Sequence, residues 1–278
     1  MKISTKKIFR WLKVLILIYC IIGIAFYYLQ ERILFHPVAV DKSVRYDLRQ
    51  PFREVDIPYN KATSLNVIEF LPASAHDSTH SGDTSKGVVL YFHGNKENIL
   101  HYAPFADDFT SQGYEVWMMD YPGFGKSTGK FSEDDLYTYA LTLYKLARSR
   151  WRPDQIIIYG KSLGTGVAAQ LADVRDCRRL ILECPYYSMT SLVRHYMPVY
   201  PVGSMLHFSF PTYQHLPRVT APITIFHGTS DGVVPYSNAS RLKPLLKTGD
   251  EFITIDGGGH NDLHDHPEFK RHLKTLLP

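Results

Sequence analysis

The sequence Gly160-Lys161-Ser162-Leu163-Gly164 places a serine between two glycines, directly after a run of branched apolar residues. Residues 155–159 predict a buried strand, and residues 164–172 predict a helix rich in small side chains. A serine at such a strand-to-helix turn, a nucleophile elbow, projects its hydroxyl into solvent, and the flanking glycines permit the sharp turn. Ser162 is therefore the candidate nucleophile.

A serine hydroxyl needs a base within hydrogen-bond reach and a third group that orients this base. After an elbow serine, the acid and then the base follow along the chain. One predicted strand runs into a turn with Asp231, and a later strand ends in three glycines before His260. Because open sheets hold active residues at the carboxyl ends of their strands, we expect both side chains to meet Ser162.

Three other positions bear on this assignment. Glu183 ends the predicted strand after the elbow helix and is the alternative to Asp231 as the acid. Lys161 is expected to point sideways, without a chemical role. Asp262 is expected to support the loop of His260.

Backbone N–H groups are also needed to stabilise the oxyanion of a tetrahedral intermediate. One donor is the residue after the nucleophile, Leu163. The other follows an early strand, and the apolar run over 87–92 leads into His93-Gly94-Asn95. We therefore expect the amide of Asn95 to be the second donor, with the glycine allowing close approach of the backbone.

Taken together, five ordered motifs resemble the α/β-hydrolases of the Bem46 and ABHD13-like group, over roughly residues 30–278. They are His93-Gly94-Asn95, Asp120-Tyr121-Pro122-Gly123-Phe124-Gly125-Lys126-Ser127, the Ser162 elbow, the Asp231 turn and Gly258-Gly259-His260-Asn261-Asp262. The resemblance implies a membrane-anchored serine hydrolase that cleaves acyl esters or thioesters without a metal. It assigns the nucleophile, acid and base to the same three residues, and the oxyanion donors to Asn95 and Leu163. Lys96 and Glu97 stand where such proteins often have small residues.

Strand and helix patterns alternate along most of the chain, which predicts an α/β fold with a mostly parallel sheet and helices on both faces. The expected strands cover residues 65–70, 87–92, 115–119, 155–159, 180–184, 223–226 and 252–255. The expected helices cover residues 98–112, 133–148, 164–172, 238–247 and 267–277.

The N-terminus combines a basic segment, residues 1–13, with an uncharged apolar span over residues 14–30. This length predicts a transmembrane signal anchor, and a cleaved signal peptide is the alternative. Residues 31–278 then form one catalytic domain. Five basic residues precede the span, so the positive-inside rule places the N-terminus in the cytoplasm and the domain on the outer side, periplasmic, extracellular or luminal.

Composition excludes several other classes. The net charge of +4 comes from the basic N-terminal segment, and the remainder is close to neutral, so nucleic-acid binding has no support. Cys177 and Cys184 flank an extended run that holds them too far apart for a disulfide, and the three cysteines match no metal or redox spacing.

Residues 185–216 interrupt the alternation and are rich in aromatic residues, methionine and proline. A cap insertion is expected here, with Tyr186, Tyr187, Met205 and Phe208 lining an acyl pocket above the elbow. Ordinary packing of an irregular connection is the alternative.

Three further patterns are expected to be structural or solvated. Residues 125–128, Gly-Lys-Ser-Thr, lack the earlier glycine of a phosphate-binding loop. His260 and His264 have a spacing that binds zinc on a helix, but no glutamate follows the first histidine and three glycines precede it. The polar stretch Ala73–Lys86 predicts a surface loop.

The sequence thus predicts a serine hydrolase of ester or thioester substrates, lipids or acylated proteins among them, with no cofactor and no metal. Peptide or amide hydrolysis by the same residues is a second hypothesis, because the geometry serves any acyl transfer. A membrane-tethered binding or scaffold protein without catalysis is a third.

Overall fold

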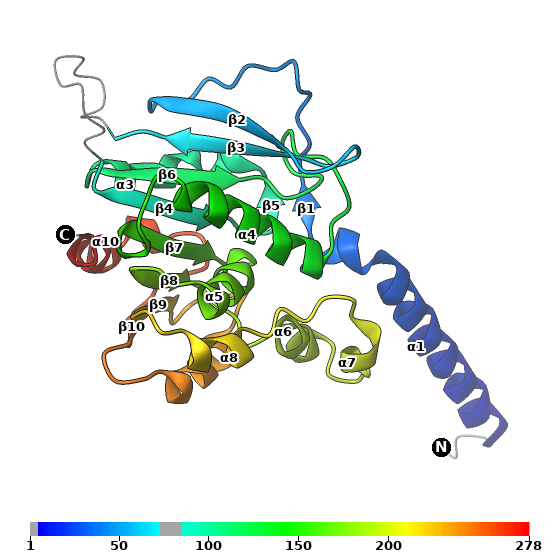
Figure 1. Cartoon of the computed structure of the whole chain (residues 1–278). Helices are drawn as coiled ribbons and strands as arrows, with labels where there is room; N and C mark the ends of the chain where they lie inside the picture. The colour runs from blue at the N-terminus through cyan, green and yellow to red at the C-terminus, as the bar shows by residue number, and fades with distance from the viewer. Residues whose placement is uncertain (1–4, 73–84, 278) are drawn as a thin grey trace.

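The computed structural model describes residues 5–72 and 85–277, built around an eight-stranded sheet in the order β10-β9-β8-β7-β4-β6-β3-β2 (Figure 1). Its strands are β2 (Phe52–Pro58), β3 (Ser64–Phe70), β4 (Gly87–Phe92), β6 (Tyr114–Met119), β7 (Ile156–Lys161), β8 (Arg179–Glu183), β9 (Ile223–Gly228) and β10 (Glu251–Ile255). The six strands from β6 to β10 in this order are parallel, whereas β3 runs antiparallel to β6 and β2 antiparallel to β3. The predicted fold class is confirmed.

Helices cover both faces of this sheet. They are α1 (Thr5–Leu34), α2 (Ile99–Tyr102), α3 (Asp107–Thr110), α4 (Glu133–Arg148), α5 (Gly164–Val174), α6 (Met189–Tyr196), α7 (Val202–Met205), α8 (Thr212–His215), α9 (Tyr236–Ala239) and α10 (Pro267–Thr275). Helices α4 and α5 pack on one face through a core that includes Leu136, Leu143 and Val167. Helices α3 and α10 cover the other face through Phe109 and Phe269.

Local sequence signals at both ends of helix α4 explain why its boundaries could be predicted. Ser132 caps it by accepting a hydrogen bond from the amide of Asp135, and acidic residues fill its first turn while Lys145 and Arg148 lie in the last. Its observed range is the predicted one, residues 133–148.

Other predicted helices are broken. The continuous helix expected over residues 98–112 is instead α2, a 3₁₀ turn over Ala103–Ala106 and α3, because Pro104 cannot continue an α-helix. Similarly, the helix expected over 238–247 is α9 followed by a 3₁₀ segment that contains Pro244. The loop expected over Ala73–Lys86 lies almost wholly outside the described residues.

Helix α1 projects away from the domain (Figure 1). In the described part of the chain it is the one helix long and apolar enough to cross a membrane, and only 6% of its most apolar window is buried. It extends to Leu34, beyond the expected end of the span. The chain then forms β1 (His36–Pro37), which pairs with β5 (Lys96–Glu97) and brings the end of α1 beside the loop after β4.

Candidate active site

The serine elbow forms at the turn between β7 and α5. Ser162 has φ of 50°, in the left-handed region that non-glycine residues rarely occupy. Only glycine fits on either side, since a Cβ on Gly160 would lie 2.5 Å from the carbonyl oxygen of Gly164, and one on Gly164 would lie 2.0 Å from that of Phe92. The strained turn thus lifts the hydroxyl out of the line of the strand.

Ser162, Asp231 and His260 lie together, each just after a strand of the sheet. His260 Nε2 is 2.9 Å from Ser162 Oγ, and His260 Nδ1 is 2.8 Å from Asp231 Oδ2. The other oxygen of Asp231 accepts the backbone N–H groups of Val233 and Val234, both at 2.8 Å. Carboxylate, imidazole and hydroxyl therefore form one continuous hydrogen-bonded chain.

The charge of Asp231 sets the hydrogen positions in this chain. Burial disfavours its ionised form, but hydrogen bonds from His260 and from two backbone amides outweigh burial and place the pKa of Asp231 below its ordinary value. An ionised carboxylate only accepts hydrogen bonds, so Nδ1 of His260 bears the hydrogen. Nε2 is then free to accept the proton of the Ser162 hydroxyl.

The loop that carries His260 is fixed from two sides. Gly259 donates its amide to Asp262 Oδ1 at 2.7 Å, the supporting contact expected for this aspartate. From below, the Lys161 ammonium donates to the carbonyl oxygen of His260 at 3.4 Å. Lys161 is expected from the sequence to have no chemical role; its structural contact with the His260 loop has no sequence signal.

Glu183, the alternative acid, does not contact His260. Its fully buried carboxylate instead accepts hydrogen bonds from Tyr159 and Lys161, and its Oε2 lies 3.0 Å from His264 Nε2. Burial would raise the pKa of Glu183, but the charges of Lys161 and His264 hold it well below the ordinary range. Glu183 is thus the centre of a separate charged network beneath the site.

His264 completes this network. Its Nδ1 lies 2.6 Å from Asp108 Oδ2, so the imidazole is clamped between two carboxylates. Burial opposes protonation, yet Glu183 and Asp108 together raise the pKa of His264 above its ordinary value. The zinc spacing of His260 and His264 is not realised, because these residues stand on a loop and a 3₁₀ turn rather than on one α-helix.

Asn95 and Leu163, the expected oxyanion donors, line the same cavity as Ser162. Within the described residues, neither amide N–H donates to a protein acceptor. The position of Asn95 is fixed by its neighbours: its side chain donates to the carbonyl oxygen of Leu34 at 2.6 Å, and its own carbonyl accepts from His36 at 2.9 Å. Both residues therefore line the cavity of Ser162 with backbone N–H groups that have no acceptor among the described residues.

The cavity at Ser162 has a volume of about 270 Å³ and mainly apolar walls. Helix α6 supplies Met189, Leu192 and Val193 to its lining, which also includes Leu34, Tyr196 and Val233. No charged side chain is among the described residues that line it. An uncharged, mainly apolar lining suits an acyl chain.

The pocket expected from the sequence needs correction. Of its four side chains, Tyr186 lines the Ser162 cavity, whereas Tyr187 lines a different groove. Met205 lies against α1, where the Gln30 side chain donates to its carbonyl, and Phe208 is buried against Phe35. Met205 and Phe208 thus pack against α1 and the segment after it, and Tyr187 packs between Tyr213 and Arg241. Residues of α6 form the cavity wall instead.

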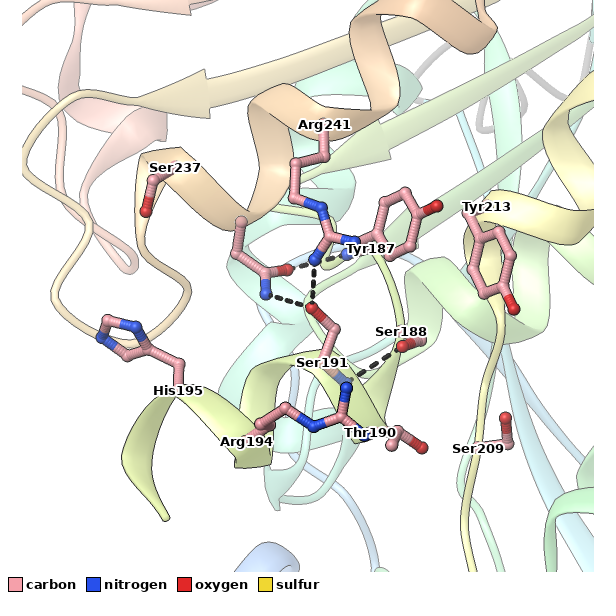
Figure 2. Close-up of a pocket in the computed structure, with 11 residues that line it drawn as sticks. Tyr187, Ser188, Thr190, Ser191, Arg194, His195, Ser209, Tyr213, Ser237 and Arg241 are labelled. Atoms are coloured by element: carbon pink, nitrogen blue, oxygen red, sulfur yellow. Dashed lines mark hydrogen bonds between the residues drawn. The ribbon is translucent and has the colours of Figure 1, made fainter. Parts of the chain in front are cut away.

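A polar groove of about 570 Å³ lies on the other face of α6 (Figure 2). Arg194, His195 and Arg241 are among its lining residues, and Ser191 Oγ accepts hydrogen bonds from Arg241 at 2.6 Å and from Asn238 at 2.9 Å. Among the described residues, none of its serines is hydrogen-bonded to a histidine. The arrangement needed for nucleophilic chemistry is therefore found at Ser162 and not in this larger groove.

Cys184, Asp231 and His260 are the three residues of the described chain whose ligand atoms cluster closely enough to hold a metal, within 4.8 Å of one another. A cysteine ligand must be a thiolate, but burial raises the pKa of the Cys184 thiol well above its ordinary value. The imidazole and the carboxylate are moreover already bonded to each other. The donor set therefore fits a hydrogen-bonded base better than a metal site.

Other residues of the sequence motifs have structural partners. Lys126 of the Gly-Lys-Ser-Thr stretch is buried, with its ammonium 2.6 Å from Glu54 and 4.0 Å from the centre of the Tyr46 ring. His93 lies within the core with Nε2 3.3 Å from Asp120 Oδ1. The cysteines of the described chain are free thiols, as expected.

Comparison with known proteins supports this architecture. The family model described as "Serine aminopeptidase, S33" matches residues 83–214, which include Ser162 but not Asp231 or His260. The most similar solved structures include an esterase of Pyrococcus furiosus, with a TM-score of 0.66 at 16% identity over 88% of this chain and 97% of that one. A monoacylglycerol lipase of Paleococcus ferrophilus has a TM-score of 0.58 at 18% identity, over 77% and 98%. At these identities the structures show a shared fold.

Curated relatives are closer in sequence. Alpha/beta hydrolase domain-containing protein 17C of Homo sapiens is 28% identical over 199 residues, 70% of this chain and 59% of that protein. Protein 17B of Xenopus laevis is 30% identical over 197 residues, which cover 70% of this chain and 67% of that protein. The match spans 59–62% of the length of the 17C relatives. With a relative of this identity and coverage, and with the fold described above, the chain belongs to the α/β-hydrolase family.

Proposed function

We propose that the chain is a membrane-anchored serine hydrolase of carboxylic esters or thioesters with acyl or lipid-like substrates. The observation on which this rests is the hydrogen-bonded series from Asp231 through His260 to the hydroxyl of Ser162, which opens on an apolar cavity. A place in the Bem46 and ABHD13-like group is part of the proposal.

Each group then has a defined role. His260 Nε2 removes the proton of Ser162 as the serine oxygen attacks the acyl carbonyl carbon, and Asp231 stabilises the resulting imidazolium. The amides of Asn95 and Leu163 donate to the oxyanion. His260 next gives its proton to the departing alcohol or thiol, which leaves an acyl-serine. Water, deprotonated by His260, attacks this ester and releases the carboxylic acid and the free serine.

The cavity favours acyl groups over peptide N-termini. An aminopeptidase that recognises a free α-amino group needs a negative or polar partner for the ammonium, because a buried unpaired charge is costly. Among the described lining residues the cavity has no carboxylate, and the nearby Asp231 already accepts three hydrogen bonds. Peptide hydrolysis is therefore the second candidate, favoured only by the description of the matching family model.

Membrane attachment is proposed from α1, whose exposed apolar surface requires a nonaqueous environment. Five basic residues at its N-terminal side favour a cytoplasmic N-terminus and a catalytic domain on the outer face. The ester or thioester would then be met on that side.

A substrate panel tests the proposed reaction. Purified full-length protein in detergent would be incubated with p-nitrophenyl esters, acyl thioesters and aminoacyl p-nitroanilides, with and without EDTA. We expect turnover of the esters and thioesters that EDTA does not change and that Ser162→Ala abolishes. Preference for the anilides would establish the peptidase alternative, and a folded protein inert towards every substrate would support the scaffold alternative.

A further inference from the structure

Helix α1 and the cap are joined by an aromatic contact deep in the apolar span. The rings of Tyr19 and Tyr200 stack in parallel with centroids 4.5 Å apart. Tyr19 donates its hydroxyl to the carbonyl of Val199 at 3.1 Å, and Tyr200 donates to the carbonyl of Tyr19 at 3.1 Å. Tyr19 of α1 is thus held against Val199 and Tyr200, which follow α6.

A second contact joins the two elements near the other end of the span. Gln30 is 1% exposed although it follows sixteen uncharged residues. Its amide group donates to the carbonyl of Met205 at 3.1 Å, and its Oε1 accepts from the amide of His207 at 2.8 Å. A polar side chain in an apolar span is costly unless it is bonded, so Gln30 is matched to the cap backbone.

The two contacts set the depth at which the cap lies. Eleven residues separate Tyr19 from Gln30, and at 1.5 Å per residue this corresponds to about 16 Å along the helix, close to half of a hydrocarbon core that is about 30 Å thick. If the cap remained in water, so would this part of α1. Only residues 14–18 of the uncharged span would then be left, about 7 Å of helix, too short for a bilayer.

The chain that contacts α1 has the composition of a membrane-inserted segment. Residues 196–206, which we name the cap segment, read Tyr-Met-Pro-Val-Tyr-Pro-Val-Gly-Ser-Met-Leu, without a charged side chain. Tyr196 is 55% exposed and Val199 is 71% exposed. Such side chains would face water in a soluble domain, and they fit lipid instead.

The backbone of the cap segment is also largely prepared for an apolar environment, where unpaired N–H groups are costly. The amides of Tyr200, Val202, Ser204 and Leu206 all donate to carbonyls within the cap segment. Its two prolines have no N–H to satisfy. Tyr19 and Gln30 of α1 supply further partners to its carbonyls.

From these observations we infer that the cap segment is embedded beside α1 in the membrane leaflet that faces the catalytic domain. The acyl chain of a lipid substrate then enters the Ser162 cavity directly from that leaflet, because Leu34 at the end of α1 and Tyr196 of the cap segment both form the cavity wall. Arg194 and His195, which directly precede the cap segment on α6, line the polar groove (Figure 2). With the cap segment embedded, they would stand near the lipid phosphates. This inference rests on the proposed membrane anchoring.

Depth-dependent quenching tests the placement. In a full-length chain with Cys20 and Cys177 replaced by alanine, Val199→Cys would be labelled with an environment-sensitive nitrobenzoxadiazole dye and reconstituted into phosphatidylcholine vesicles with spin-labelled acyl chains. The matched control is Lys274→Cys on α10, at the end of the molecule opposite α1 (Figure 1). We expect strong quenching at position 199 and none at position 274. Equal, weak quenching at both positions would overturn the inference.

A charge variant tests the consequence for substrate entry. Val199→Lys would place a cation in the leaflet, and Val174→Lys at the far end of α5 is the control, with a valine that is 42% exposed. We expect Val199→Lys to cleave a vesicle-embedded long-chain ester about fivefold more slowly or worse, and a soluble butyrate ester at the normal rate. Wild-type turnover of the embedded ester would overturn the inference. A parent chain inert to both esters would reject the proposed hydrolase function, while the quenching result would still decide the placement.

Discussion

The Lys161 ammonium, one residue before the candidate nucleophile, forms a buried ion pair with Glu183 at the end of the neighbouring strand. The same ammonium also donates to the backbone carbonyl of His260. The elbow strand is thereby connected to the loop that holds the proposed base, through a charged pair that solvent does not reach.

Removal of one partner from this pair should destabilise the fold. Lys161→Met would leave the carboxylate of Glu183 buried without its main cation, and loss of one member of a buried pair typically costs about 3–5 kcal/mol. We expect the double variant Lys161→Met, Glu183→Gln to be more stable than Lys161→Met alone, because no carboxylate is then buried without Lys161 and His264 keeps Asp108 as its partner. Chemical unfolding of the detergent-solubilised variants checks this, and equal stability of the single and double variants would contradict the coupling.

Asp231, rather than Glu183, should be the acid that orients the base. Asp231→Asn would remove the negative charge and favour the wrong imidazole tautomer, and we expect a loss of about 10⁴ in kcat for ester hydrolysis with little change in stability. Asp262→Asn is the matched control, since an amide oxygen still accepts the N–H of Gly259. A loss of less than tenfold in Asp231→Asn would show that another residue orients His260.

The stability that Glu183 and His264 contribute to the fold should fall at both low and high pH. Glu183 has a lowered pKa, so its contribution is present above its ordinary value of 4.5 and is lost as the pH falls towards its folded value. His264 has a raised pKa, so its contribution is complete below 6.5 and is lost as the pH rises through its folded value. The contribution of the pair is therefore largest between pH 4.5 and 6.5.

Thermal unfolding of wild type and His264→Gln tests this window. We expect the difference in Tm to be larger at pH 5.5 than at pH 8.5, because the variant lacks the imidazolium whose charge Glu183 and Asp108 stabilise. The two proteins are compared at each pH, so that other titrating groups cancel. A Tm difference that grows with pH would contradict the assignment of a charged His264.

A larger side chain should impair hydrolysis of long-chain esters on one face of α6 and not on the other. Leu192 lines the Ser162 cavity and Thr190 the polar groove, so Leu192→Trp should fill acyl space whereas Thr190→Trp should not. We expect Leu192→Trp to lower kcat/KM about tenfold for a dodecanoyl ester and to spare an acetyl ester. Parallel chain-length profiles of the two variants are the measurement, and an identical profile for both would place the acyl site elsewhere.

Much of the fold could be predicted because each central strand is a continuous apolar run between clear breaks. Strand β2 was missed, since it lies at the sheet edge and includes Arg53, Glu54 and Asp56, which weaken the strand pattern. Pro104 is a local signal for the end of α2, and the apolar periodicity of residues 98–112 alone does not take it into account.

In the site, too, residues at strand ends could be predicted, whereas contacts between residues far apart in the sequence could not. Ser162, Asp231 and His260 each follow a strand, so their meeting at one sheet edge could be expected from topology. The members of the network around Glu183, in contrast, come from distant positions: His264 contacts Glu183, and Asp108 in turn contacts His264, without any local sequence pattern. Likewise, Met205 was misplaced because its neighbour is α1, and how α1 packs on the cap has no counterpart in sequence periodicity.

Reaction with a fluorophosphonate probe, followed by mapping of the adduct by mass spectrometry, tests the central claim most directly, because only an activated serine attacks the phosphorus rapidly. If His260 activates Ser162, one adduct is expected on Ser162 in the full-length protein, absent from Ser162→Ala and formed much more slowly in Asp231→Asn. A folded wild-type protein that remains unlabelled, or that is labelled at another serine, would contradict this activation of Ser162.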